Sequence, residues 1–598
     1  MPFADSLKNA HSAINYKKAL FIIFTVIVIV FGLINTPFTE RWNAKPEVYL
    51  YFTGVFSLSL FLVFWNIKNN VIEFNIIDLT LIIYFSYFLV YELLESSLTH
   101  FYLRDDFLSL LTAVCLYVCF KQIIKFSPDI CGLIVLLIVS IELLLGFYQA
   151  FSRGLTHKPL FGHITGTFRN SGVFAIFLAC CLPYVFSILD KEKKEFFNKK
   201  IIKALILGVI LLIVADKSRT GLLLVFLTIL FIYRKTFFRL WERYVKDRFL
   251  MKLWICCLCI IAILLLIYLK YPSFIGRYFI WKIAISMFMD KPFWGWGLAG
   301  FEKYYLYHQA DYFKTHISDN IQYVNVAEEA TNAFCEYLMI LVRFGLVGFI
   351  LFFFFLYKSL ITYLKHRTPN IYPALTLLLI LISSVFYYSF RVSIILAVAM
   401  LSLAEVASKI PSIRISNWGL RQLNRGLYAL LLIGAVVYCE GQYQATLLWK
   451  ETGKYRVKNG GYSLHLFAKA YPELRHRSNF LYNYGAILFE TGYYQKSIKV
   501  MEECRRIEAG IDLLLFLGNA YQQTNNNIQA EACYKEASYM APSRFNPKYL
   551  LVQFYLKNRM IEKALPIVKE IIRMPEKVHS EEVDNMKNEM ANILLKYK

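Results

Sequence analysis

The sequence predicts an all-α protein in two parts: a polytopic helical membrane domain with about 12–13 transmembrane helices, and a C-terminal α-solenoid. Three observations predict this fold class. Hydrophobic residues make up 58% of the 598 residues, whereas charged residues make up only 18%. Long apolar runs recur through residues 1–441. The polar tail at 442–598 has helical periodicity and an internal repeat.

This composition excludes a wholly soluble chain and a disordered one, because so much apolar surface has to meet lipid. The formal net charge is +23. In a soluble protein that charge would favour nucleic acid, but in a membrane protein it is expected on cytoplasmic loops, so we expect no nucleic-acid partner. The cysteines form no CxxC pair with a matching His or Cys set, so we expect no metal site and no cofactor.

The expected spans follow from apolar runs that approach the thickness of the bilayer. Two of them, 106–120 and 220–233, are short for a full crossing. The spans are 19–35, 48–66, 75–94, 106–120, 130–150, 171–189, 201–215, 220–233, 250–269, 336–357, 371–389, 393–408 and 427–441.

Loop charge sets the expected orientation. The loops near 190–200 and 234–252 are rich in Lys and Arg, which places them in the cytoplasm together with the N-terminus. An odd number of spans then places the tail at 442–598 on the outer face. The loop at about 270–335 lies on the same side.

The tail carries helical hairpins in register. Ala530 and Ala564 lie 34 residues apart, which is the length of a tetratricopeptide repeat. Stacked repeats leave a concave face, so we expect a protein partner there. The residues at repeat spacing are Leu517, Gly518, Tyr521, Ala530, Tyr534, Ala537 and Pro542.

Two compact polar loops open helices at the outer face. The first, 161–172, contains Thr167 and Asn170, and its backbone N–H groups favour phosphate; the alternative is a helix start capped by Asn170. The second, 216–221, places Arg219 where a helix enters the membrane. An arginine at that depth is a candidate site residue, and the alternative is that it snorkels to lipid headgroups.

The outer loop adds an aromatic, amphipathic helix at 278–289, which we expect to lie in the membrane interface. Arg277 heads it, Trp281 and Lys282 lie within it, and a Gly-rich turn follows. Further on, Tyr305 and Gln309 combine aromatic and polar groups. Such a surface suits sugars or lipid headgroups, and equally suits a belt at the membrane edge.

The last motif opens the helix at 336–357. Glu336 at this boundary has three open interpretations: a general base, a partner for Arg343, or a carboxylate that favours the positive end of the helix dipole.

Together these motifs resemble the O-antigen ligase and polymerase superfamily of bacterial inner-membrane glycosyltransferases, in a branch with C-terminal tetratricopeptide repeats. The resemblance covers about 161–348 and the tail. The motifs that carry it run in the order Gly-Thr-Phe-x-Asn, Ser-Arg-Thr-Gly, Arg-x-x-x-Trp-Lys, Asp-Lys-Pro-x-x-Gly-x-Gly, Glu-Tyr-Leu and Arg-Phe-Gly-Leu-Val-Gly.

The resemblance implies a metal-independent enzyme that takes a glycan from an undecaprenyl-diphosphate carrier at the periplasmic face and joins it to a glycan or lipid acceptor. Arg219 and Arg277 match the arginines that grip the diphosphate, and Glu336 is the third catalytic candidate. The expected substrate-binding residues are Thr167, Asn170, Trp281, Lys282, Tyr305, Gln309 and Arg343.

The sequence departs from the family at one place. Ligases commonly have His-Asn before the Glu-Tyr-Leu helix, whereas this chain has Phe334 and Cys335, and neither can act as that histidine would. Two other classes therefore remain open. One is a transporter or flippase for a lipid-linked glycan, and the other is a non-catalytic membrane scaffold that recruits partners through its repeats.

Overall fold

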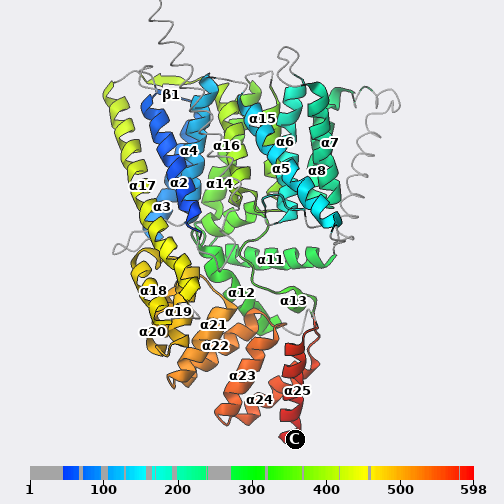
Figure 1. The fold of residues 1–598 in the computed structure, drawn as a ribbon, viewed down its shortest axis with the longest axis vertical. Helices are drawn as coiled ribbons and strands as arrows, with labels where there is room; N and C mark the ends of the chain where they lie inside the picture. Colours follow the sequence, from blue (N-terminus) through cyan, green and yellow to red (C-terminus); the bar gives the residue numbers. More distant parts are fainter. Residues whose placement is uncertain are drawn as a thin grey trace, which may run out of the picture.

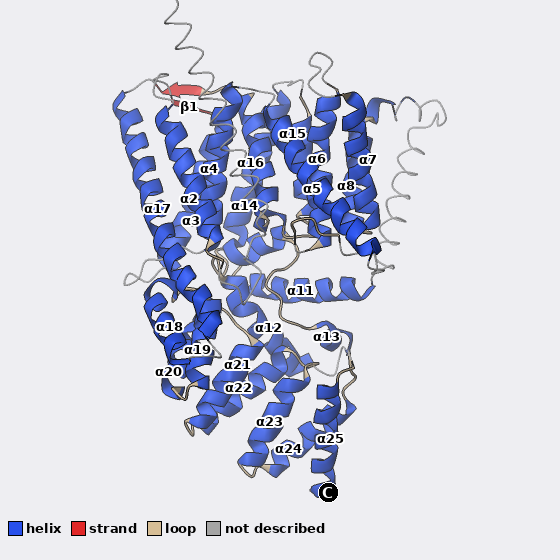
Figure 2. Ribbon diagram, in the orientation of Figure 1, coloured by secondary structure: helices blue, strands red, loops and turns tan. Residues whose placement is uncertain are grey.

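The computed structural model describes residues 45–65, 72–95, 105–126, 130–155, 164–168, 170–190, 198–236, 239, 271–316, 321–365, 370–415, 418–455, 460–577 and 579–597. Within these ranges the chain is helical apart from one two-stranded pair (Figure 2). The expected spans 19–35 and 250–269 lie outside the described residues.

The upper part of the molecule in Figure 1 is a bundle of apolar helices. Each expected span within the described ranges corresponds to a helix, apart from 371–389, of which only the first part does. The bundle contains α2 Glu47–Trp65, α3 Ile76–Glu95, α4 Asp105–Phe126, α5 Ile130–Leu155, α6 Ser171–Leu189, α7 Lys199–Ala215, α8 Arg219–Ile232, α14 Glu336–Lys365, α15 Tyr372–Ser383, α16 Ser393–Ser408 and α17 Trp418–Tyr455.

Five of these helices are long and apolar enough to cross a membrane, namely α4, α5, α6, α14 and α17, so this is a multi-pass membrane protein. The 14-residue α8 is short, as the sequence indicated, but α4 is not. It continues to Phe126, because Lys121 is paired inside the bundle with Asp78 rather than ending the helix.

One expected span is interrupted. The run at 371–389 forms α15 only as far as Ser383; the chain then turns and makes a 3-10 helix, Ser389–Arg391. The hydroxyls of Ser383 and Ser384 both donate to the Ile380 carbonyl, which also accepts the Ser384 N–H at 3.0 Å, so side-chain hydrogen bonds to the backbone gather where α15 ends.

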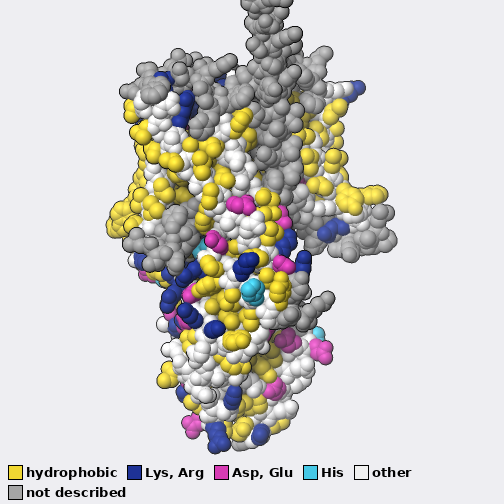
Figure 3. Space-filling view, turned by 60° about the vertical axis from the view of Figure 1, so that its left-hand side comes forward, with side chains coloured by type: hydrophobic (Ala, Val, Ile, Leu, Met, Phe, Trp, Pro, Cys, Tyr) yellow, Lys and Arg dark blue, Asp and Glu magenta, His cyan; other side chains and the backbone are white. Residues whose placement is uncertain are grey.

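The two faces of the bundle differ. On one face, β1 (Ile72–Phe74) pairs antiparallel with β2 (Ile413–Ile415). The other face carries all the helices of the outer loop and the solenoid (Figure 1). On the view in Figure 3, hydrophobic side chains cover much of the described bundle, and Lys, Arg, Asp and Glu gather below it.

The outer loop folds against the base of the bundle. It contains α11 Tyr271–Asp290, α12 Gly300–His316 and α13 Ile321–Val326. As Figure 1 shows, α11 lies across the base of the bundle and does not run parallel to its helices.

The tail forms paired helices, as predicted. They are α18 Gly460–Leu474, α19 Ser478–Glu490, α20 Tyr494–Ile507, α21 Ile511–Gln523, α22 Asn527–Met540, α23 Phe545–Lys557, α24 Ile561–Arg573 and α25 Glu581–Lys596. Gly518 of α21 faces Tyr534 of α22, and a Cβ at Gly518 would lie 2.6 Å from the tyrosine ring. Only glycine allows this approach of the two helices.

Candidate active site at the base of the bundle

Three polar helix starts lie at the base of the bundle, and each follows a backbone residue with a positive φ angle. Gly166 (φ 56°) precedes the start of α6, Lys217 (φ 53°) precedes that of α8, and Phe334 (φ 50°) precedes that of α14. Positive φ is uncommon for residues with a side chain. It reverses the chain sharply, so these helices begin at compact turns.

The turn before α6 is held by two polar side chains of α5, the buried Glu142 and the half-buried Gln149. The Thr167 hydroxyl donates to Glu142 Oε1 at 2.5 Å, and the Thr167 N–H donates to Oε2 at 3.2 Å. Gln149 accepts the N–H groups of Thr165 and Gly166, both at 2.9 Å. Thr167 therefore positions the turn through Glu142. Asn170 caps α6 by accepting the Gly172 N–H at 2.8 Å.

Arg219 is the first residue of α8 and is half-buried. Ser218 caps this helix by accepting the Gly221 N–H at 3.3 Å. Gly221 lets α8 pack closely on α6, because a Cβ there would already lie 3.0 Å from Ala175. The start of α8 is therefore anchored beside the start of α6.

Arg277 does not head its helix as expected: α11 begins six residues earlier, at Tyr271, and the guanidinium lies between two aromatic rings. Its guanidinium carbon is 5.4 Å from the centre of the Phe334 ring and 5.1 Å from that of Tyr387. It also donates to the Phe386 carbonyl at 3.1 Å. The Tyr387 hydroxyl in turn lies against Gly172 at the start of α6. Arg277 is thus connected to the start of α6 through Tyr387, and to the start of α14 through Phe334.

Two other residues of α11 have their hydrogen-bond partners within the loop at 270–335. The indole N–H of Trp281 donates to the Ala333 carbonyl at 2.8 Å, which fixes the segment before α14. Lys282 is exposed, with its ammonium 4.6 Å from the centre of the Tyr312 ring.

Tyr305 and Gln309 do not lie with the other candidates. Both are fully buried between α12 and the solenoid. The Tyr305 hydroxyl donates to Gln309 Oε1 at 2.9 Å, and Gln309 Nε2 donates to the Met540 carbonyl of α22. These contacts dock the solenoid on the outer loop and leave neither side chain on a surface.

A second polar cluster joins Glu336 and Arg343 with residues that the sequence did not single out. Arg343 contacts Asp106 at 2.9 Å and Glu302 at 2.6 Å. Arg391 contacts the same Glu302 oxygen at 2.7 Å. Glu336 Oε1 accepts the N–H of Phe390 at 3.0 Å.

The cluster comes from α4, α12, α14 and the 3-10 helix. No sequence spacing connects these segments, although Asp106 at the start of an apolar run was a readable signal.

A break in α14 holds this cluster in position. Gly345 has φ 61° and ψ −162°, which interrupts the helix. The turn at 292–297 inserts there and satisfies the freed backbone groups. Trp296 N–H donates to the Val342 carbonyl at 2.9 Å, and the Leu346 N–H donates to the Pro292 carbonyl at 2.8 Å. The Gly-rich motif and the Arg-Phe-Gly motif are therefore two halves of one structure.

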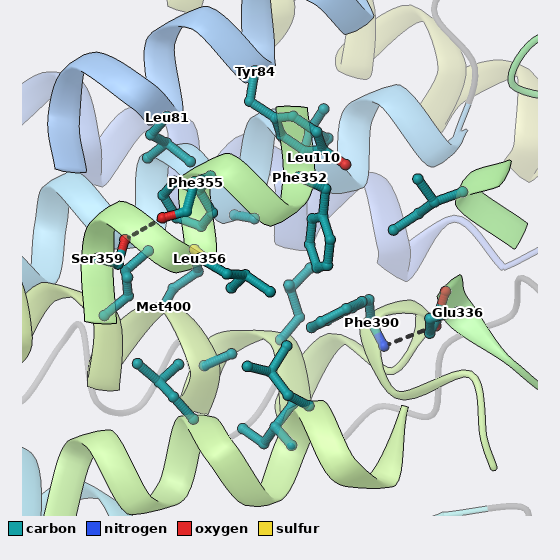
Figure 4. Close-up of a pocket in the computed structure, with 18 of the residues that line it drawn as sticks. Leu81, Tyr84, Leu110, Glu336, Phe352, Phe355, Leu356, Ser359, Phe390 and Met400 are labelled. Atoms are coloured by element: carbon teal, nitrogen blue, oxygen red, sulfur yellow. Dashed lines mark hydrogen bonds between the residues drawn. The ribbon is translucent and has the colours of Figure 1, made fainter. Parts of the chain in front are cut away.

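A cavity of about 510 Å³ runs upward from this cluster, between α3, α4, α14, α15 and α16. Figure 4 shows Glu336 and Phe390 at one end and Ser359 at the other. Asp106, Arg343 and Arg391 line the same end as Glu336, and the remaining lining is mainly aliphatic and aromatic.

Among the described residues, the grouping that could hold a metal ion is Glu576, His579 and Asp584, at the far end of the solenoid. His579 already contacts both carboxylates, at 3.3 and 3.5 Å, and its side chain is 79% exposed. This is an exposed ion-pair cluster remote from the bundle.

Comparison with known families agrees with these two parts. Residues 204–353 match the O-antigen ligase family, and residues 511–544 match a tetratricopeptide repeat. The ligase match includes Arg219, Arg277, Glu336 and Arg343, together with the turn at 292–297. No curated protein matches the chain.

Proposed function

We propose that this multi-pass membrane protein, which carries an O-antigen ligase domain and a C-terminal tetratricopeptide repeat, is a glycosyltransferase of the bacterial inner membrane. It transfers or polymerises a glycan from an undecaprenyl-diphosphate carrier at the periplasmic face. The acceptor is a glycan or a lipid, and the solenoid binds a protein partner.

One observation carries this proposal. Arg219 and Arg277, which the ligase match includes, both lie at the base of the bundle where polar helix starts meet the membrane boundary. A guanidinium presents a planar fork of N–H donors that matches phosphate oxygens. The positive ends of the α6 and α8 helix dipoles also lie at this base, and they favour a negatively charged group.

The chemistry needs little more than this. A sugar diphosphate carries a good leaving group, so transfer depends chiefly on cations that stabilise the departing charge. Deprotonation of the acceptor hydroxyl is a smaller contribution, and Glu336 is the carboxylate proposed for it. Phe334 and Cys335 cannot supply a base of the histidine type, so the chain relies mainly on its arginines.

The charge of the opposite face supports a periplasmic site. That face carries basic side chains at the start of α7 and after α8, as expected of cytoplasmic loops. They are Lys199, Lys200, Lys203, Arg234, Lys235 and Arg239. The solenoid and the arginine site lie on the other side of the bundle (Figure 1).

The test is glycan transfer by variants of Arg219 and Arg277 in a deletion strain. Arg219→Ala should lower the rate about 10²–10³-fold, because removing one contact to the developing charge has an effect of that size. Arg219→Lys keeps the charge but loses the fork, so it should retain part of the activity. Arg153→Ala, at the end of α5, is the matched control and should transfer normally.

Three outcomes would contradict the proposal. Full transfer by the Arg219→Ala, Arg277→Ala double variant would remove the diphosphate role. Carrier-linked precursor trapped in the cytoplasm of the deletion strain would indicate a flippase. If glycan transfer is lost on deletion of the solenoid but is unchanged in the Arg219 and Arg277 variants, the protein is a scaffold.

A further inference from the structure

Arg277 is held in a different way from Arg343 and Arg391. Those two arginines each contact the Glu302 carboxylate, at 2.6 and 2.7 Å. Arg277 has two aromatic rings and one carbonyl as its partners, and within the described ranges it pairs with no carboxylate. A carboxylate would neutralise the guanidinium and occupy its fork, whereas rings and a single carbonyl leave its charge and most of its N–H donors free for an anion.

One of the two rings, that of Tyr387, belongs to a turn whose backbone is held from both sides. The N–H groups of Phe386 and Tyr387 both donate to the Ser383 carbonyl at 3.0 Å. The hydroxyls of Ser383 and Ser389, both buried, share a hydrogen bond of 2.8 Å that joins the end of α15 to the 3-10 helix. Arg277 donates to the Phe386 carbonyl of the same turn, so the turn holds the guanidinium by its backbone as well as by a ring.

The hydroxyl end of Tyr387 lies against the first turn of α6. A Cβ at Gly172 would lie 2.3 Å from the Tyr387 hydroxyl oxygen and 3.1 Å from the ring carbon that bears it. Gly172 is buried, and its N–H donates to the side chain of Asn170, so the backbone there is held in place. Gly172 does not have a positive φ angle, so a glycine is needed here for space and not for its backbone conformation.

We propose that Tyr387 is a positioning residue for glycan transfer: its ring, held between Gly172 and Arg277, directs the guanidinium fork of Arg277 toward the diphosphate of the donor. This inference rests on the proposed function, in which Arg277 binds that diphosphate. A planar fork matches phosphate oxygens only in the correct orientation, so a small displacement of the ring should weaken donor binding.

The experiment measures binding without turnover, with the full chain in lipid nanodiscs and geranyl diphosphate as the probe; binding to empty nanodiscs is subtracted. Tyr387→Leu removes the aromatic face and should weaken binding about tenfold, whereas Tyr387→Phe keeps the ring and should weaken it at most about twofold. Arg277→Ala should weaken binding at least as much as Tyr387→Leu does. Geraniol, which lacks the phosphates, should bind all these variants equally.

A second pair of variants tests the contact with α6. Gly172→Ala should displace the Tyr387 ring and weaken binding of geranyl diphosphate about tenfold. Adding Tyr387→Phe removes the hydroxyl that the new Cβ meets, so the double variant should recover most of the binding. Gly276→Ala is the matched control, because it precedes Arg277 in α11 and a Cβ there would come no closer than 3.8 Å to its nearest neighbour, Val326. Unchanged binding by Gly172→Ala, or no recovery in the double variant, would overturn the inference.

Non-additivity separates positioning from a role in folding. If Tyr387 acts through Arg277, Tyr387→Leu should weaken binding no further in a chain that already carries Arg277→Ala. A further loss there, as large as the loss in the wild-type background, would mean that Tyr387 supports the fold and would also overturn the inference.

The proposed function fails separately. If Arg277→Ala binds geranyl diphosphate as the wild type does, the diphosphate role of Arg277 is wrong, and this inference is wrong with it. If Arg277→Ala loses binding while Tyr387→Leu and Gly172→Ala do not, Arg277 keeps its role and only the positioning by Tyr387 is refuted.

Discussion

At the scale of single residues, Gly345 has the most demanding position in the bundle. Its φ and ψ of 61° and −162° lie in a region that residues with a side chain hardly enter. A Cβ there would lie 2.3 Å from the Phe293 carbonyl oxygen. Neither a rotamer change nor a small shift removes such a contact, because the obstacle is backbone.

Gly345→Ala should therefore destabilise the bundle by more than the strain of about 1–3 kcal/mol that this conformation alone would impose. We expect a lower melting temperature of the purified protein and loss of glycan transfer, since Arg343 and Glu336 lie just before the break. Gly434→Ala is the control, because nothing lies within 4 Å of a Cβ at that position of α17. Equal melting of the two variants would show that the break tolerates a side chain.

At the scale of elements, one contact recurs between the paired helices of the solenoid, and the sizes of its two side chains differ from pair to pair. Gly485 faces Met501, and the equivalent Gly518 faces Tyr534. In the next pair, Val552 and Val568, both fully buried, occupy the positions 34 residues further on. A small residue thus accompanies a large partner, and two medium residues replace them in the third pair.

Gly518→Leu should lower the free energy of unfolding by about 1–3 kcal/mol, the usual effect of overpacking. Thermal melting of the full chain, followed by hydrogen exchange in α21 and α22, measures it. Gly453→Leu in α17 is the control, because a Cβ there meets nothing within 4 Å. If Gly518→Leu melts like that control, the close approach of Tyr534 is not a constraint.

These elements also mark where sequence reasoning succeeded. Helices and repeats depend on local periodicity, so the spans and the paired helices of the tail could be read from the chain. The break at Gly345 depends on the turn at 292–297, and the buried state of Tyr305 and Gln309 depends on α22. Likewise, Arg391 joins Glu302 across 89 residues. Such long-range contacts leave no periodic signal.

At the scale of the whole molecule, the solenoid is fixed to the bundle at residues adjacent to the candidate sites. Arg477 contacts Asp105 at 3.0 Å, next to the Asp106 that holds Arg343. Burial lowers the pKa of Arg477, but Asp105 together with Tyr49 and Tyr438 raises it above the ordinary value for arginine. The Ala509 N–H also donates to the Glu302 carbonyl at 3.1 Å. The solenoid is therefore attached to the bundle next to the residues that hold Arg343.

Arg477→Ala should weaken the attachment of the solenoid to the bundle. Removing one partner of a buried ion pair costs about 3–5 kcal/mol, and the partial exposure of this pair favours the lower figure. We expect faster hydrogen exchange at α18, α19 and the start of α4, and slower glycan transfer, with α23 and α24 unchanged. Arg475→Ala is the control, since its guanidinium stacks on Tyr471 within the same part of the solenoid. Unchanged exchange at α4 would separate the solenoid from the site.

The interrupted helix α14 also dictates an order of assembly during synthesis. The carbonyls and N–H groups that lose their helical partners at the break are hydrogen-bonded to the turn at 292–297, which the ribosome produces first. With the loop at 270–335 on the periplasmic side, as proposed, the turn has to cross the membrane and fold before residues 336–365 can pack on it. In that orientation, export of the loop has to precede the packing of α14, because a helix with open backbone groups is not tolerated in lipid. Slower translocation of the loop should therefore leave α14 incompletely inserted, before any sugar is bound.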